Sequence, residues 1–241
     1  MRFTRSALDS FRGGSLPDLL GDHTRLLFVG INPGLRAVAV QAHFGGGGSN
    51  RFYPALYQAG IVDRRIDASA GFLPDDLTHL HERGLGITSL VAGASARADE
   101  LTVEQLITGA AALSERVEHI APAVVAVLGI TAYRTAFARP QARVGPQPDP
   151  LGGSAVWVVP NPSGLNKHAS LADLANAYRE VAIAAGIELF TAPDRPASLL
   201  TADRRFFSTS QAVNDAVDDG AEPLRRPACL DEHAKPDHRG K

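Results

Sequence analysis

Cysteine, lysine and long apolar runs are all scarce in this sequence. The 241 residues include a single cysteine, Cys229, which can form neither an internal disulfide nor a cysteine-rich metal or iron–sulfur site. No apolar run approaches the ~20 residues that span a bilayer. The first twenty residues mix Arg with Asp and lack the apolar core of a signal peptide. We therefore expect a cytoplasmic protein with no membrane partner.

Charge of one sign is also missing, since the formal net charge is only −2. The overall balance therefore does not indicate a nucleic-acid partner, and any DNA binding would need a local basic patch. The apolar fraction, 44%, is ordinary for a globular domain. Lysine occurs at only three positions, and Lys167 is the one that lies outside the polar C-terminal part.

Apolar segments of strand length alternate with helical patterns along the first 190 residues. The expected strands are residues 26–30, 87–91, 124–129 and 155–160. The expected helices are residues 50–58, 75–83, 102–120, 130–138 and 169–185. This alternation predicts an α/β fold with three layers, α/β/α, around a central, mainly parallel four-stranded sheet.

The segments between these elements give weaker signals. We expect a short helix at residues 16–20, a long flexible loop at residues 35–48 and Ser49 as the N-cap of the following helix. Helical and strand periodicity fails after about residue 191, where Pro, Asp, Arg and Ala dominate. We therefore predict one domain over residues 1–190 and a largely disordered polar tail over residues 191–241.

Two of the expected strands end in Asn-Pro turns. The first strand continues into Gly-Ile-Asn-Pro-Gly-Leu at residues 30–35, and the fourth into Asn-Pro-Ser-Gly-Leu at residues 161–165. Ligands of open α/β sheets bind outside the carboxyl ends of the strands. The two turns should therefore lie on the same rim of the sheet and share one pocket.

These two motifs, in this order and at this spacing, resemble the active-site motifs of the mismatch-specific uracil/thymine-DNA glycosylases. That family is the Mug/TDG branch of the uracil-DNA glycosylase superfamily. Between the motifs, His43-Phe44 before four glycines and Asn-Arg-Phe-Tyr at residues 50–53 resemble the family's aromatic loop and following helix. The resemblance covers about residues 24–188, with departures at Arg36-Ala37 and Asn166-Lys167.

The resemblance implies a DNA glycosylase of base excision repair. Such an enzyme would hydrolyse the N-glycosidic bond of uracil, or of related or bulkier pyrimidine lesions paired with guanine in double-stranded DNA. Asn32 and Asn161 would be the catalytic residues. Asn32 would hold the attacking water through its amide oxygen, and Asn161 would be a neutral donor to the departing base. No cofactor or metal is implied, and a monomer that is nucleoid-associated on DNA is expected.

The same resemblance assigns the remaining site residues to two groups. The flipped base would be bound by Ile31, Gly34, Ala37 and Phe44, with Phe44 stacking on the ring. The duplex would be contacted by Ser163, Gly164, Leu165, Asn166 and Lys167, with Leu165 filling the gap that the flipped base leaves. No lysine is placed to form a Schiff base, so we expect a monofunctional enzyme without strand cleavage.

Two other functions remain open at this stage. One is a non-catalytic mismatch- or damage-binding module on the same fold. The other is an α/β enzyme acting on free nucleosides, for which the segment around Leu165 would have no purpose. A serine hydrolase built on Ser163 and His168 is disfavoured because the Gly-x-Ser-x-Gly elbow is missing.

Overall fold

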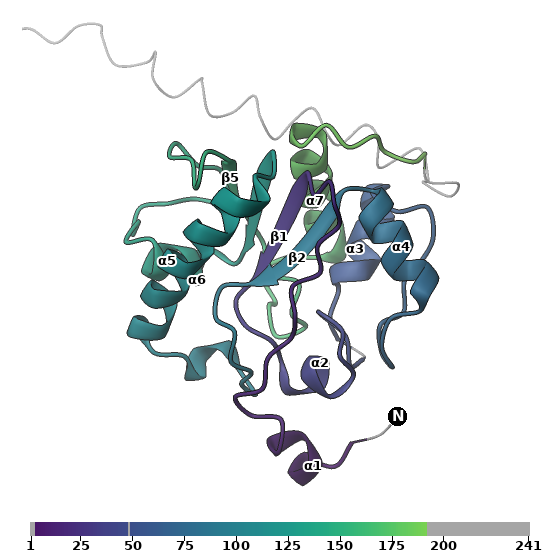
Figure 1. The fold of residues 1–241 in the computed structure, drawn as a ribbon, viewed down its shortest axis with the longest axis vertical. Coiled ribbons are helices and arrows are strands. Elements are labelled where there is room, and N and C mark those ends of the chain that lie inside the picture. The colour runs from purple at the N-terminus through teal and green to yellow at the C-terminus, as the bar shows by residue number, and fades with distance from the viewer. Residues whose placement is uncertain (1–2, 48, 192–241) are drawn as a thin grey trace, which may run out of the picture. The chain divides into compact units, whose positions relative to one another are not determined.

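The structure, a computed structural model, describes residues 3–47 and 49–191 (Figure 1). Its centre is a five-stranded sheet with the strand order β2-β1-β3-β5-β4. The strands are β1 (Leu26–Gly30), β2 (Leu85–Ser89), β3 (Val124–Leu128), β4 (Gly145–Pro146) and β5 (Ala155–Val159). All pairings are parallel except that of β4 with β5. The predicted α/β class with a mainly parallel sheet is thus confirmed.

The expected number of strands was wrong by one. Within the irregular loop before β5, Gly145 and Pro146 pair antiparallel with Val158 and Trp157 and form the edge strand β4. Gly145 and Pro146 give no strand pattern in the sequence, because proline is tolerated only at a sheet edge and glycine disfavours strands. Periodicity therefore could not predict this short pairing.

Helices cover both faces of the sheet. They are α1 (Arg5–Asp9), α2 (Leu35–Ala39), α3 (Phe52–Ala59), α4 (Pro74–Glu82), α5 (Val103–Ile120), α6 (Ile130–Ala136) and α7 (Leu171–Ala184), with a 3₁₀ turn at Ala98–Glu100. In Figure 1, α5 and α6 lie on one side of the strands, and α3, α4 and α7 lie on the other. This arrangement is the expected three-layer architecture.

The alternation of side chains along β1 builds a core on each face. Phe28 packs with Phe52 and Tyr178 of α3 and α7, whereas Val29 packs with Leu113 of α5. Every residue of β1 is buried, as expected for a central strand covered on both sides. The aromatic rings of Phe28 and Phe52 meet edge to face, with centroids 5.1 Å apart. This packing fixes the position of α3, which begins beside the edge of the sheet where the carboxyl ends of the strands lie.

Three local predictions need correction. Residues 16–20 are not helical, because Leu19 exchanges backbone hydrogen bonds with Ile87 at 2.9 and 2.8 Å. The segment 35–48 is not all loop, since it begins with α2. Ser49 is not the N-cap of α3; instead Oδ1 of Asn50 accepts a hydrogen bond from the backbone N–H of Phe52 at 2.9 Å.

The caps of the two longest helices follow the sequence signals. Thr102 and Gln105 form a reciprocal capping box at the start of α5, and Ser170 and Asp173 form another at the start of α7. No helix in the described segments is long and apolar enough to cross a membrane. The predicted tail lies outside the described residues from residue 192 onward.

Candidate active site

The carboxyl ends of four strands surround one cavity of about 460 Å³. Gly30, Ser89 and Leu128 end β1, β2 and β3, and Asn161 follows β5. The volume is in the usual range of small-molecule sites, ~300–1,000 Å³. The predicted site residues that line the cavity are Ile31, Asn32, Gly34, Ala37, Phe44, Asn161, Ser163, Leu165 and Asn166. Gly164 and Lys167 belong to the same loop but are not part of the cavity wall.

Asn32 stands at the end of β1 with its amide nitrogen tied down. Nδ2 donates to the Gly93 carbonyl at 3.1 Å and to Oγ of Ser95 at 2.8 Å. A carbonyl can only accept, so this bonding fixes which end of the amide is nitrogen. Oδ1 accepts no hydrogen bond from the described residues. The amide oxygen is therefore free to accept a hydrogen bond from a ligand or a water in the cavity.

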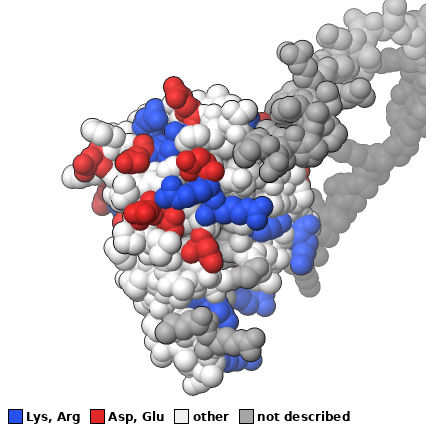
Figure 2. Space-filling model, turned by 90° about the vertical axis from the view of Figure 1, so that its right-hand side faces the viewer, with Lys and Arg blue, Asp and Glu red and all other residues white. Residues whose placement is uncertain are grey.

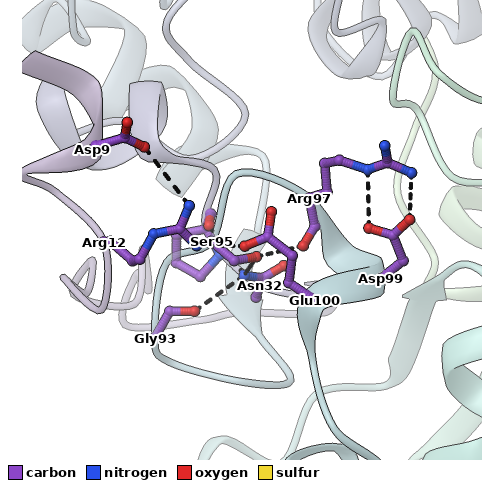
Figure 3. Close-up of polar contacts among 9 residues, drawn as sticks. Asp9, Arg12, Asn32, Gly93, Ser95, Arg97, Asp99 and Glu100 are labelled. Carbon is purple, nitrogen blue, oxygen red and sulfur yellow. Dashed lines mark hydrogen bonds and ion pairs between the residues drawn. The ribbon is translucent and has the colours of Figure 1, made fainter. Parts of the chain in front are cut away.

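Ser95, which the sequence did not single out, orients that amide (Figure 3). Its hydroxyl donates to the Arg97 carbonyl at 2.7 Å, so its lone pairs are left for Nδ2 of Asn32. Its backbone N–H donates to the Pro33 carbonyl at 3.2 Å. The loop after β2 thus braces the turn after β1. A serine among small polar residues carries no motif, and only this long-range contact shows its role.

Ion pairs hold the outer part of the same loop (Figure 3). Arg97 forms a forked pair with Asp99, and Arg12 bridges Asp9 and Glu100. Such exposed pairs each contribute little to stability. Because Arg97 and Asp99 line the cavity, they nevertheless contribute to its charge pattern together with Arg36.

Asn161 shows the reverse arrangement. Its Oδ1 accepts a hydrogen bond from the backbone N–H of Ser163 at 2.9 Å, closing an Asx turn. A backbone N–H can only donate, so this contact fixes Oδ1 as the acceptor, and Nδ2 donates to none of the described residues. Asn161 thus offers amide hydrogens to the cavity, where Asn32 offers an oxygen.

Phe44 forms an aromatic wall of the cavity. Its ring stacks on Phe52 at a centroid distance of 4.0 Å and an interplanar angle of 26°. Its backbone is left-handed, with φ of 55°, which is rare and strained for a bulky residue. The amide N–H groups of Ile31 and Phe44 donate to no other backbone group among the described residues. Both are therefore free to bind the polar edge of a planar ligand.

His43 is a second cavity residue that sequence reasoning left without a role. The ring is buried, and Nε2 lies 2.8 Å from the Pro17 carbonyl, which requires a hydrogen on Nε2. Burial lowers the pKa of His43, although the hydrogen bond to Pro17 and the charge of Asp18 act in the opposite direction. His43 is thus a neutral ring in this wall at neutral pH.

One side of the cavity is open for larger ligands. Gly34 has φ of −77°, and a Cβ built there would meet no atom within 4 Å. Ala37, one turn into α2, presents only a methyl group. Neither residue restricts a ligand beside Asn32 in the way a large side chain would.

The β5–α7 loop, residues 160–170, carries the predicted duplex contacts. Leu165 is 74% exposed, which is unusual for a large apolar side chain. Both ends of the Asn166 amide form hydrogen bonds inside the loop, because Nδ2 donates to the Asn161 carbonyl at 2.9 Å and Oδ1 accepts from the His168 N–H at 3.1 Å. Lys167 is exposed beside it.

Charges on one face are distributed unevenly (Figure 2). Acidic and basic side chains are intermixed over the upper part of this view. In the lowest part of this view, the charged side chains that can be seen are basic. Two basic residues, Arg36 and Arg97, line the cavity together with the acidic Asp99. DNA binding would require local basic character of this kind.

No group of three or more His, Cys, Asp or Glu that could hold a metal occurs among the residues described.

The sequence matches the family model described as the Uracil DNA glycosylase superfamily over residues 17–184. Among solved structures, the chain is similar to a solution NMR structure of a candidate uracil DNA glycosylase from Methanosarcina acetivorans. That match has 17% sequence identity and a TM-score of 0.49, and covers 71% of this chain and 98% of the other.

Proposed function

Because the chain belongs to the uracil DNA glycosylase superfamily, we propose that it is a monofunctional, mismatch-specific DNA glycosylase of the Mug/TDG type. Its substrates would be uracil and bulkier pyrimidine lesions paired with guanine in double-stranded DNA. The observation that carries this proposal is the pair of asparagines at the cavity, one offering an oxygen and the other offering amide hydrogens.

Asn32 serves the nucleophile in this proposal. Cleavage of an N-glycosidic bond needs a water aimed at the anomeric carbon of the extruded nucleotide. The fixed amide oxygen of Asn32 accepts a hydrogen bond from that water and orients it. An amide does not take the proton as a carboxylate would, so the enzyme depends on positioning, and turnover is slow.

Asn161 and the two free backbone amides serve the departing base. Negative charge develops on the base as the bond breaks, and donors that are fixed in advance stabilise it most effectively. Nδ2 of Asn161 and the N–H groups of Ile31 and Phe44 are such donors. Stacking on Phe44 holds the base in place and contributes about 1–3 kcal/mol.

The open wall at Gly34 and Ala37 supports a broad choice of base. Pocket shape decides which flipped bases enter, and an added Cβ at Gly34 would meet nothing. Substituents on the pyrimidine, such as an etheno ring, would therefore be accepted beside uracil.

The β5–α7 loop supports action on duplex DNA. The exposed Leu165 fills the gap in the base stack, as apolar wedges do in other DNA-bending proteins. Ser163 and Lys167 contact phosphates, with the opposite guanine next to the loop. Lys167 is the only lysine of the described residues and does not line the cavity, which supports hydrolysis without a Schiff base.

A single-turnover assay tests this proposal. Enzyme in excess is mixed with duplexes carrying uracil, 3,N4-ethenocytosine or thymine opposite guanine, and free base is measured directly. The proposal expects release of uracil and ethenocytosine from duplexes, with an intact abasic strand left behind. Tight duplex binding without any base release would favour the non-catalytic binding module. Release from free nucleosides but not duplexes would favour the nucleoside enzyme.

A further inference from the structure

Arg51 stands at the start of α3, yet its side-chain hydrogen bonds all lead to the β5–α7 loop. Nη1 donates to the Ala169 carbonyl at 2.5 Å. Nη2 donates to the Ser163 carbonyl at 3.1 Å and to the Asn166 carbonyl at 2.9 Å. The backbone N–H of Arg51 adds a bond to the Pro162 carbonyl at 3.0 Å. One residue thus ties four positions of a loop more than a hundred residues away in the sequence.

The two carbonyls bound by Nη2 belong to Ser163 and Asn166, which lie on either side of Leu165 in the chain. Leu165 itself is 74% exposed and is held by few contacts of its own. The exposed side chain is therefore presented by a loop whose backbone is fixed on both sides. Only a guanidinium can supply this number of donors in one planar group.

A second contact presses the same loop against the start of α3. A Cβ at Gly164 would lie 2.4 Å from Cβ of Ser49 and 2.7 Å from its carbonyl oxygen, so only glycine fits there. The loop therefore lies directly on the segment that carries Arg51. Any movement of this segment must change the shape of the loop.

Arg51 is partly buried, and this burial leaves polar atoms without hydrogen-bond partners in the described part of the chain. Its Nε, and the hydroxyl of Tyr178, are buried without a hydrogen-bond partner among the described residues. Tyr178 lies near enough for the charge of Arg51 to influence its pKa, which burial raises well above the ordinary value. An apolar residue in place of Arg51 would avoid the unpaired Nε, so a role in shaping the loop explains the arginine better than a role in stability.

We propose that Arg51 is a positioning residue that holds the β5–α7 loop in the shape that presents Leu165 to duplex DNA. It contacts neither the reacting atoms nor the base. The inference rests on the proposed function for its DNA part, because the wedge role of Leu165 belongs to that function. The part that concerns the loop can be tested without any activity.

The first test uses endoproteinase Lys-C, which cuts after lysine. Lys167 lies in the loop and is the only lysine of the described residues. Arg51→Gln removes the fork of donors. The cut after Lys167 should become about tenfold faster or more, because the loss of hydrogen bonds to a charged group shifts the opening equilibrium of the loop by at least that factor. The matched control is Arg179→Gln, which removes another guanidinium bound to a carbonyl, that of Ala59 in α3 at 3.3 Å.

Thermal unfolding of each variant separates local from global effects. If Arg51→Gln unfolds the whole protein, Arg51→Lys takes its place, because an ammonium keeps the charge but not the planar fork. The new lysine gives a fragment of different mass, so the cut after Lys167 is still read separately. A rate at Lys167 that rises no more than in Arg179→Gln would overturn the proposal.

The second test compares uracil release from double-stranded and single-stranded DNA. Arg51→Gln should reduce release from the U·G duplex at least several-fold more than release from the single strand. In a Leu165→Ala background, Arg51→Gln should add little further loss on the duplex, because the two changes act through one element. Equal losses on both substrates, or fully additive losses, would contradict the positioning role.

The two tests also distinguish a failure of the proposed function from a failure of the inference about Arg51. A wild type that releases no base from any substrate would refute the proposed function, and the Lys-C rates would still decide whether Arg51 holds the loop. An active wild type with unchanged Lys-C rates and duplex preference in Arg51→Gln would refute the inference about Arg51 alone.

Discussion

Asn32 and Asn161 present opposite ends of their side-chain amides to one cavity: the oxygen of Asn32 and the nitrogen of Asn161. Nδ2 of Asn32 is anchored by Gly93 and Ser95, whereas Oδ1 of Asn161 is anchored by the Ser163 N–H. The anchors are groups whose donor or acceptor nature is fixed, so neither amide can be turned over without losing its bonds. Two identical side chains thus offer complementary groups to the cavity, an acceptor on Asn32 and a donor on Asn161, which is what their proposed roles toward water and the departing base require.

The donor role of Asn161 is tested by Asn161→Asp. The aspartate keeps an oxygen for the Ser163 N–H but loses the amide hydrogens and adds negative charge beside the departing base. We expect single-turnover uracil release to fall at least ~10²–10³-fold, as for loss of a fixed donor to a developing anion. Asn50→Asp is the control, because Asn50 also lines the cavity and its Oδ1 also accepts a hydrogen bond from a backbone N–H, that of Phe52. Similar losses in both variants would refute the specific role.

Pocket size is tested by Gly34→Tyr. The backbone at Gly34 suits any residue and the space beside it is open, so the variant should fold normally. The ring should obstruct bulky bases more than uracil, and one methyl-sized clash is worth ~1–3 kcal/mol. Release of ethenocytosine should therefore fall at least tenfold more than release of uracil. Equal losses on both bases, or a wild type that releases uracil alone, would show that the open wall does not select substrates.

The wedge is tested by Leu165→Ala. Leu165 is mostly exposed, so the change should leave the melting temperature nearly unaltered. Binding to a U·G duplex and release from it should both weaken, while a single-stranded substrate should be affected less because it has no gap to fill. Exposed Ile183 of α7 provides the control Ile183→Ala. An equal loss on duplex and single-stranded substrates would assign Leu165 a purely structural role.

The buried His43 predicts a dependence of stability on pH. Its folded pKa lies below its unfolded value of about 6.5, so protons bind preferentially to the unfolded chain as the pH falls. The free energy of unfolding should be highest above about pH 6.5 and decline as the pH falls through the folded pKa. In His43→Gln this part of the decline should be absent. Denaturant titrations between about pH 5 and 8 check the difference, and parallel curves would contradict it.

The fold was predictable where local patterns and tertiary packing agree. The four long strands and the capping boxes at Thr102 and Ser170 follow from apolar runs and cap residues. The two-residue strand β4 and the antiparallel bridge at Leu19 escaped, because isolated backbone pairings leave no periodicity in a sequence. The short helix α2 escaped because it lies within a segment rich in loop residues.

The candidate site shows the same division. The strand-end position of Asn32 and Asn161 could be predicted from the turn that follows each strand. Their amide orientations could not, since these depend on Ser95 and on the Asx turn at Ser163. The contacts of Arg51 were not predictable either, because its partners lie more than a hundred positions away in the chain. Long-range polar contacts of this kind are visible only in three dimensions.

The most direct test of the central claim is the single-turnover rate of uracil release from a U·G duplex by wild type and by Asn32→Ala, with duplex binding measured in parallel. In the variant the Ser95 hydroxyl keeps its bond to the Arg97 carbonyl, and water in the cavity can replace the lost amide, so folding and binding should be largely retained. Because the positioned water loses its acceptor, the rate should fall ~10²–10⁴-fold. A rate close to that of wild type in a variant that still binds the duplex would contradict the assignment of Asn32 as the catalytic residue.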